Sequence, residues 1–351
     1  MFGSIPPMDA LSECICKPET PIGMRMRAAY YLRHLHSIGS KENQDRALSI
    51  LKMGLLNDQH GSLLRHEFAY VMGQIKDESS CSVLEDVLSN EDDCVMVRHE
   101  CAEALGAIGA NRSKPTLEQI LARHPDCLEL SETCRLALDV IDWRANGGDG
   151  EMPGAACACM LNPYSSVDPA PPHPSHQNKS AEELGNILCN DDLHIFERYR
   201  SMFSLRNKGG EDCVLQLCRA LTTDTSSALL RHEVAYVLGQ MQHPASVEAL
   251  ETSLRRQDEH DMVRHESAEA LGAIEGRWED CEKILQEFAK DNNIVVRESC
   301  LVALDAADYW GQTNHNSCSG EVEDSKDGPL SQEEIKSPPN RVLVNHFNVK
   351  A

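Results

Sequence analysis

The sequence predicts an all-α fold, an α-solenoid of eight HEAT-like helical hairpins arranged in two pseudo-symmetric halves of four. Three observations predict it: a long internal repeat, a shorter period of 33 residues within each half, and a low aromatic content. Only 5% of the 351 residues are aromatic, whereas alanine and leucine are abundant. This composition favours short, closely packed helices over a large sheet core.

The long repeat places two His-Glu pairs in each half of the chain. Residues 65–74 (RHEFAYVMGQ) recur at 231–240 (RHEVAYVLGQ), and residues 97–108 (VRHECAEALGAI) recur at 263–274 (VRHESAEALGAI). The two segments recur at the same offset, and within each half the two pairs are 33 residues apart. Because this period, with a second apolar segment in every unit, is typical of stacked helical hairpins, we expect each unit to be one hairpin.

The same frame extends to units that lack the His-Glu pair. Residues 25–32 and 198–205 precede the His-Glu units, and residues 132–138 and 298–304 follow them. Each half therefore has four units, of which only the middle two carry His-Glu. The partner helices are expected at apolar segments 47–55, 82–88, 214–221, 247–254 and 281–288.

The repeats and the local composition divide the chain into five segments. We expect an N-terminal extension over 1–20, a helical half over 21–145, a linker over 146–180, a second helical half over 181–312, and a tail over 313–351. The linker is rich in Gly, Pro and Ala and is expected to be flexible. The tail is polar and mixed in charge, so we expect it to be disordered.

Charge and composition argue against several classes of function. The net charge of -23 argues against a nucleic-acid partner, because phosphate binding needs a basic surface. It favours a basic protein or an ammonium group instead. No apolar run approaches the roughly 20 residues that cross a membrane, and the N-terminus lacks a signal-peptide pattern. We therefore expect a cytoplasmic protein, in which buried cysteines such as Cys101, Cys134 and Cys300 are free thiols.

The His-Glu pairs lie away from the apolar face of their helices. On a helix over 97–108, Val97 and Leu105 share the core face, while His99, Glu100 and Glu103 lie on the opposite side. The other three copies repeat this arrangement. We therefore expect histidine and glutamate to line the inner, concave surface of the solenoid.

This placement makes the four pairs candidate metal ligands. Neighbouring helices pack about 8–10 Å apart, so imidazoles from two adjacent helices can converge on one ion. If the halves face each other about a pseudo-two-fold axis, two metal sites meet there. Imidazole and carboxylate without thiolate is typical of non-haem iron(II) and oxygen chemistry, whereas structural zinc prefers cysteine. The candidates are His66, Glu67, His99 and Glu100 in the first half, and His232, Glu233, His265 and Glu266 in the second.

Two other functions are compatible with helical repeats. A non-catalytic scaffold would bind a basic peptide in an acidic groove, and related short repeats occur in lyases that attach bilin pigments. Neither needs His-Glu pairs confined to two units of each half, so the pattern favours a metal centre.

Two further residue types in the repeat are assigned structural roles. The arginine before each histidine is expected to contact carboxylates, and a glycine in each unit is expected to let helices approach closely. These residues are Arg65, Arg98, Arg231 and Arg264, and Gly73, Gly106, Gly239 and Gly272.

The two halves of four units, the four His-Glu pairs and the linker segment 162–172 (NPYSSVDPAPP) together resemble the deoxyhypusine hydroxylase family of HEAT-repeat di-iron monooxygenases. The resemblance covers residues 21–310. It implies two iron ions, Fe2+ in the resting reduced state, and O2 as co-substrate. It also implies hydroxylation of the deoxyhypusine side chain on the hypusine-bearing eukaryotic translation initiation factor, a basic protein substrate, with an electron donor that the sequence does not identify.

The resemblance assigns ligands residue by residue. It implies that His66, His99 and Glu100 hold one iron and that His232, His265 and Glu266 hold the other. Glu67 and Glu233 match family glutamates close to the metals, either as ligands or as contacts to the substrate amines. With Glu103 and Glu269, they would line the cleft with negative charge that suits a cationic arm.

Overall fold

The computed structural model describes residues 6–148, 162–164 and 166–316, and its regular elements there are α-helices and short 3-10 helices. Sixteen α-helices in these residues pair into eight hairpins, so the predicted all-α solenoid is confirmed. The first helices of the hairpins are α1 Met8–Cys16, α3 Lys41–Leu56, α5 Cys81–Ser89, α7 Lys114–Arg123, α9 Ala181–Leu188, α11 Glu211–Thr223, α13 Val247–Arg255 and α15 Trp278–Phe288.

The second helices of the hairpins form the inner layer. Each of them packs against the next one in its half, and together they carry the repeats identified in the sequence. They are α2 Ile22–Ile38, α4 Ser62–Ile75, α6 Val95–Ile108, α8 Leu128–Ala145, α10 Ile195–Lys208, α12 Ala228–Met241, α14 Asp261–Ala273 and α16 Ile294–Asn316. The 3-10 helices η1 Glu78–Ser80, η2 Asn111–Ser113, η5 Pro174–His176 and η6 Pro244–Ser246 each precede the first helix of a hairpin.

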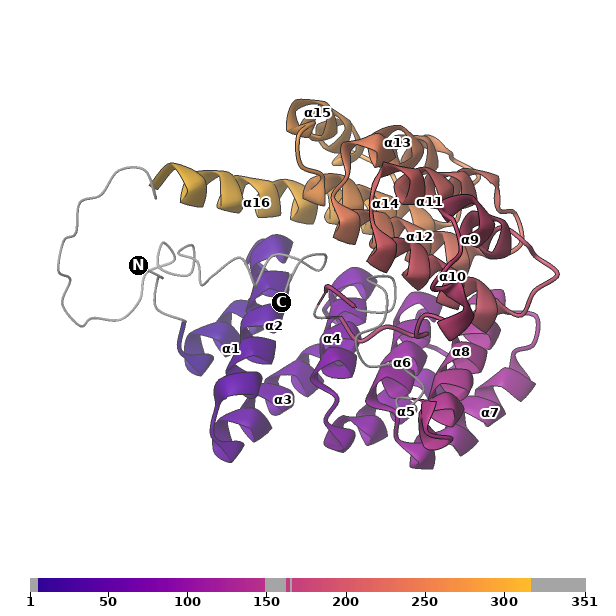
Figure 1. Ribbon diagram of the computed structural model, residues 1–351. Helices are drawn as coiled ribbons and strands as arrows, with labels where there is room; N and C mark the ends of the chain where they lie inside the picture. The colour runs from indigo at the N-terminus through magenta and orange to yellow at the C-terminus, as the bar shows by residue number, and fades with distance from the viewer. Residues whose placement is uncertain (1–5, 149–161, 165, 317–351) are drawn as a thin grey trace.

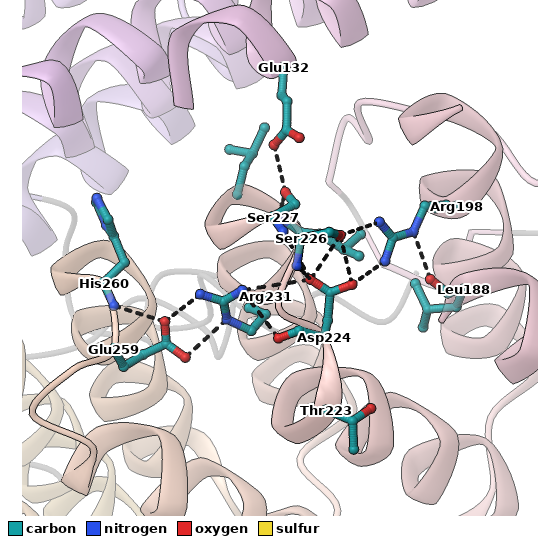
Figure 2. Close-up of polar contacts among 12 residues, drawn as sticks. Glu132, Leu188, Arg198, Thr223, Asp224, Ser226, Ser227, Arg231, Glu259 and His260 are labelled. Atoms are coloured by element: carbon teal, nitrogen blue, oxygen red, sulfur yellow. Dashed lines mark hydrogen bonds and ion pairs between the residues drawn. The ribbon is translucent and has the colours of Figure 1, made fainter. Parts of the chain in front are cut away.

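The two halves face each other and close at both ends (Figure 1). Helix α8 contacts α10 and α12 at one end of the interface, and α16 contacts α2 and α4 at the other. Polar contacts join α8 to the second half. Ser227 donates to Glu132 at 2.6 Å (Figure 2), and the ring of His260 lies 3.1 Å from Glu129. The inner helices therefore form a closed ring rather than an open groove.

A recurring arginine fixes five of the eight inner helices to the helix before them. The side-chain Nε of this arginine donates to the carbonyl oxygen of the residue ten positions earlier, near the C-terminus of the preceding helix. Carbonyl groups there lack intrahelical donors, so the arginine satisfies one of them. The five pairs are Arg25 with Ile15, Arg65 with Leu55, Arg98 with Leu88, Arg198 with Leu188, and Arg264 with Leu254.

The predicted arginine–carboxylate contacts are present for three of the four repeat arginines. Arg65 pairs with Asp93, Arg231 with Glu259 and Arg264 with Asp291, each at 2.6 Å; Figure 2 shows the Arg231 pair. The prediction is wrong for Arg98, whose guanidinium lies beside the ring of His124 at 3.3 Å. An imidazole stands there in place of the acidic residue found in the other repeats.

The repeat glycines are positions of close helix approach, as predicted. A Cβ atom on Gly73 would lie 2.8 Å from the Cα of Ala104 on the next inner helix. A Cβ on Gly106 would lie 2.9 Å from the Cα of Ala137, and one on Gly272 the same distance from the Cα of Ala303. The role of Gly239 stays a prediction. These contacts allow the His-Glu helices to pack side by side.

Two parts of the chain differ from the expected segment pattern. Helix α1 lies within residues 1–20, where no repeat was expected, because the apolar side chains of Met8, Leu11 and Ile15 share one buried face. The described part of the linker is packed against the halves, and Ala170 is fully buried. The exact segment boundaries stay a prediction. Cys157 and Cys159, a closely spaced pair of cysteines in the linker, and the tail from residue 317 lie outside the described residues.

Other expectations concern the cysteines and the membrane. Cys101, Cys134 and Cys300 are free and buried, as predicted. Among the helices of the described chain, none combines the length and apolar character that a bilayer crossing requires.

Candidate metal centre

Four inner helices bring the predicted histidines together between the two halves. Within each half, the ring centroids of His66 and His99 are 5.3 Å apart, and those of His232 and His265 are 5.4 Å apart. Across the halves, His66 lies 5.7 Å from His265, and His99 lies 5.7 Å from His232. The four imidazoles from α4, α6, α12 and α14 therefore form one cluster.

All eight residues of the His-Glu pairs are buried, with exposed fractions of at most 5%. The sequence placed them on the inner, concave surface, and they do lie on the inner faces of their helices. The inner surface is the interior of the molecule, however, because the second half covers the first.

The imidazole nitrogens have no hydrogen-bond partner among the described residues. Both ring nitrogens of His66, His99, His232 and His265 are buried and unpartnered. His66 Nε2 lies 2.9 Å from Glu100 Oε2, and His232 Nε2 lies 3.5 Å from Glu266 Oε2, but neither contact is aligned as a hydrogen bond. Buried polar groups without partners are costly. Ligand atoms that converge without bonding each other fit a metal ion between them.

Two sets of ligand atoms converge to within 4.8 Å of one another. One is His66, His99 and Glu100, which is the set predicted for the first metal. The other is His66, His232 and His265. The structure thus brings the two histidines of the second predicted set together, with His66 rather than Glu266 as the third member; Glu266 lies beside His232.

Burial sets the protonation of these groups. It lowers the pKa of His66 and His232 to about 4, which keeps both imidazoles neutral at neutral pH. It raises the pKa of Glu100 and Glu266 to about 8. Neutral imidazoles and deprotonated carboxylates are the forms that bind metals, so a bound cation would favour loss of the protons from both glutamates.

Glu67 and Glu233 have different surroundings, although they occupy equivalent positions in the repeat. Glu67 accepts a hydrogen bond from the hydroxyl of Tyr30. Its pKa is raised by burial and then by Glu269, while Arg33 acts in the opposite direction. The pKa of Glu233 is raised by burial and then by Glu103 and Asp168.

A narrow pocket adjoins the cluster on the side of the linker. It is bordered by the candidate ligands His66, Glu100, His232 and Glu266, and by Glu103 and Glu233. Its remaining walls are Tyr70, Gln74, Tyr236 and linker residues 166–169. The sequence did not predict this second group as site residues. Identical Tyr and Gln residues in the two copies of the long repeat were a signal for the helix positions, whereas the linker residues have no counterpart in a repeat.

Known proteins match both the repeats and most of the chain. A sequence model of the family described as HEAT repeats matches residues 48–132, 181–272 and 214–305. Deoxyhypusine hydroxylase from Drosophila melanogaster is 40% identical over 302 residues, covering 86% of this chain and 92% of the relative. The enzyme from Homo sapiens is 41% identical over 303 residues, covering 86% of this chain and 91% of the relative.

Fold and site together define a HEAT-repeat protein with a buried histidine and glutamate cluster that could hold metal. The structure of human deoxyhypusine hydroxylase in complex with glycerol superposes with a TM-score of 0.75 at 41% identity, covering 86% of this chain and 96% of that one. The chain belongs to the deoxyhypusine hydroxylase family. The predicted enzyme class, a deoxyhypusine monooxygenase, is thereby confirmed.

Proposed function

We propose that this protein binds two iron ions between its halves and, with O2, hydroxylates the deoxyhypusine side chain of the hypusine-bearing eukaryotic translation initiation factor. The observation that carries the proposal is the set of eight buried, unpartnered imidazole nitrogens beside Glu100 and Glu266. A donor set of histidine and carboxylate without thiolate suits iron in oxygen chemistry.

His66, His99 and Glu100 would hold one iron, and His232, His265 and Glu266 would hold the other. Iron supplies the activation of O2 that organic side chains cannot provide. In the reaction, one oxygen atom enters a C–H bond of the aminobutyl arm and the other leaves as water, which requires two electrons from a donor.

The protein's own residues keep the site dry and correctly protonated. The closed inner ring excludes bulk water from the cluster, since His99 is fully buried and His265 is 1% exposed. Burial holds the pKa of the imidazoles well below their usual range, so they remain neutral ligands. Glu67 and Glu233 contribute carboxylates next to the cluster, as ligands or as contacts to the substrate amines.

The pocket and the overall charge suit the substrate. The arm of deoxyhypusine is unbranched and carries amines, which are cationic at neutral pH. The pocket is narrow and bordered by Glu103 and Glu233, and the net charge of -23 favours approach of a basic protein.

Mass spectrometry of the substrate tests this proposal. The full-length protein, loaded with Fe2+, is incubated with the deoxyhypusine-bearing factor, O2 and a chemical reductant. The expected result is a mass gain of one oxygen atom on the modified lysine, with iron analysis giving about two ions per chain. A substrate of unchanged mass, or a purified protein that takes up no iron, would favour a non-catalytic scaffold instead.

A further inference from the structure

The pseudo-two-fold relation sorts four carboxyl groups, of which Glu103 is half-buried and the other three are buried, into two equivalent pairs. Glu67 and Glu233 are related by the long repeat, and so are Glu103 and Glu269. Glu67 and Glu269 are hydrogen-bonded by residues of α2 and α16, two helices in contact with each other, whereas Glu103 and Glu233 border the same pocket. One pair, Glu67 with Glu269, therefore lies on one side of the histidine cluster, and Glu103 with Glu233 lies on the other.

Side chains of the protein compensate the first pair of carboxyl groups, Glu67 and Glu269. The hydroxyl of Tyr30 donates to Glu67, and Ser299 Oγ donates to Glu269 at 2.8 Å. The positive charge of Arg33 also acts on Glu67. Neither carboxyl group of this pair borders the pocket.

The second pair lacks all three compensating groups. Arg198 in α10 donates to the carbonyl oxygen of Leu188, just as Arg25 in α2 donates to that of Ile15. The two helices therefore align with Arg25 equivalent to Arg198. Phe203, which has no hydroxyl, therefore stands where Tyr30 does. Thr133 stands where Ser299 does, and its hydroxyl donates to the backbone carbonyl of Glu129 at 2.6 Å.

The third compensating group would be an arginine, but in this half a linker residue binds it. Arg206 is the equivalent of Arg33 in the same alignment, and both arms of its guanidinium bind the carboxylate of Asp168, at 2.8 and 2.6 Å. The other charged residues that border the pocket with Glu233 are acidic: Glu100, Glu103, Asp168 and Glu266.

Glu233 is a buried, unpartnered acid that borders the pocket. It is 3% exposed, and the described residues give neither it nor Glu103 a hydrogen bond or ion pair. Both border the narrow pocket between the histidine cluster and linker residues 166–169. A buried carboxylate without a partner is costly, so burial raises the pKa of both groups and favours their protonated forms. An ammonium group bound between them would favour loss of those protons, so this side of the cluster suits a cation.

We propose that Glu103 and Glu233 together bind an amino group of the substrate arm, which reaches the metal centre from the side of linker residues 166–169. This inference rests on the proposed function and adds Glu103 as a substrate-positioning residue. An alkylammonium group carries several donors and can bridge two carboxylates, and such charge-assisted hydrogen bonds orient as well as attract. Because only one of the two equivalent pairs borders the pocket and lacks protein partners, the arm has one direction of approach.

A pair of matched variants tests this assignment in the iron-loaded, full-length protein. Glu103→Gln removes one charge of the open pair, and Glu269→Gln removes its pseudo-symmetric equivalent. For Glu103→Gln we expect KM for the deoxyhypusine-bearing factor to rise about tenfold or more, with a smaller effect on kcat. For Glu269→Gln we expect KM to stay within about twofold, even if kcat falls because Glu269 lies 3.7 Å from His265.

The comparison separates this inference from the proposed function. Hydroxylation by the wild-type protein establishes the function whatever the variants do. An unchanged KM in Glu103→Gln, or an equal rise in both variants, would overturn the assignment. Iron content and circular dichroism show whether each variant is loaded and folded.

A second variant approaches the same question by adding a group rather than removing one. Phe203→Tyr places a hydroxyl next to Glu233 as Tyr30 places one next to Glu67. We expect it to weaken binding of the probe 1,4-diaminobutane to the iron-loaded protein by several-fold in calorimetry. Unaltered affinity in a folded Phe203→Tyr variant would count against an open Glu103–Glu233 pair.

Discussion

The hydroxyl oxygens of Tyr70 and Tyr236 lie 2.8 Å apart, although the two residues are 166 positions apart in the sequence. They occupy equivalent positions in α4 and α12, so the contact lies where the two halves are related by the pseudo-two-fold axis. Both tyrosines also border the pocket. A direct hydrogen bond between the halves is thus built into the wall of the candidate site.

Tyr70→Phe should destabilise the protein by about 1 kcal/mol, the net value of one buried hydrogen bond. The cost should not be larger, because the hydroxyl of Tyr236 keeps a second partner in Gln240 at 3.1 Å. Urea unfolding of the metal-free protein measures it. Equal stability of the variant and the wild type would show that the contact does not join the halves in solution.

His99→Leu should separate metal binding from the stability of the fold. The imidazole of His99 is fully buried, and neither nitrogen has a partner among the described residues, so an apolar side chain of similar volume removes an uncompensated cost. We expect the metal-free variant to be at least as stable as the metal-free wild type, while binding at most about one iron per chain.

Thermal unfolding with and without Fe2+ measures both effects. Iron should raise the Tm of the wild type more than that of His99→Leu, because a ligand stabilises the state that binds it. His60→Leu is the control, since His60 is also buried but its Nδ1 lies 2.9 Å from the carbonyl oxygen of Gly54. A variant at His99 that keeps two irons would contradict the ligand assignment.

The candidate ligands could be predicted from the sequence because they recur in the long repeat. Their burial and the contacts between the halves could not, because the residues involved do not recur. The long repeat identifies His66, His99, His232 and His265 without any structure. Their burial depends on how the halves close, and the contacts that close them join residues such as Glu132 and Ser227, whose pairing has no periodic signal.

The asymmetry of the site is hidden for the same reason. Tyr30 and Phe203 are equivalent in the matching segments 25–32 and 198–205. The sequence does not show, however, that Tyr30 donates to Glu67 or that Asp168 binds Arg206. Helix α1 was missed because it is short and precedes the recognisable units.

The pair of His260 and Glu129 should make the contact between the halves depend on pH. The hydrogen bond to Glu129 raises the pKa of His260 above its ordinary 6.5, and the same bond lowers the pKa of Glu129 to about 2. A raised histidine pKa stabilises the fold fully below about pH 6.5, and the effect is lost as pH rises through the folded pKa. A lowered glutamate pKa stabilises above about pH 4.5 and is lost toward pH 2.

The stabilisation from this pair should therefore be greatest between about pH 4.5 and 6.5 and should fall above that range. Its size should be below about 1 kcal/mol, because the imidazole is 43% exposed and water screens the charge. Urea unfolding of the wild type and of Glu129→Gln at pH 5.5 and pH 8.5 measures the difference. A gap between the two proteins that is the same at both pH values would rule out this coupling.

Asp168→Asn should destabilise the protein far more than loss of an exposed ion pair. The guanidinium of Arg206 is fully buried, and the variant leaves its charge without a carboxylate, a change that costs about 3 kcal/mol or more in buried pairs.

Glu287→Gln is the matched control: Glu287 also binds an arginine through both oxygens, at 2.7 and 2.8 Å, but both partners of the Arg255 pair are exposed. That control should cost less than about 1 kcal/mol. Because Asp168 also keeps Arg206 away from the acidic pair, Asp168→Asn should raise KM for the substrate as well. Equal losses of stability in the two variants would mean that the linker is not held by this ion pair.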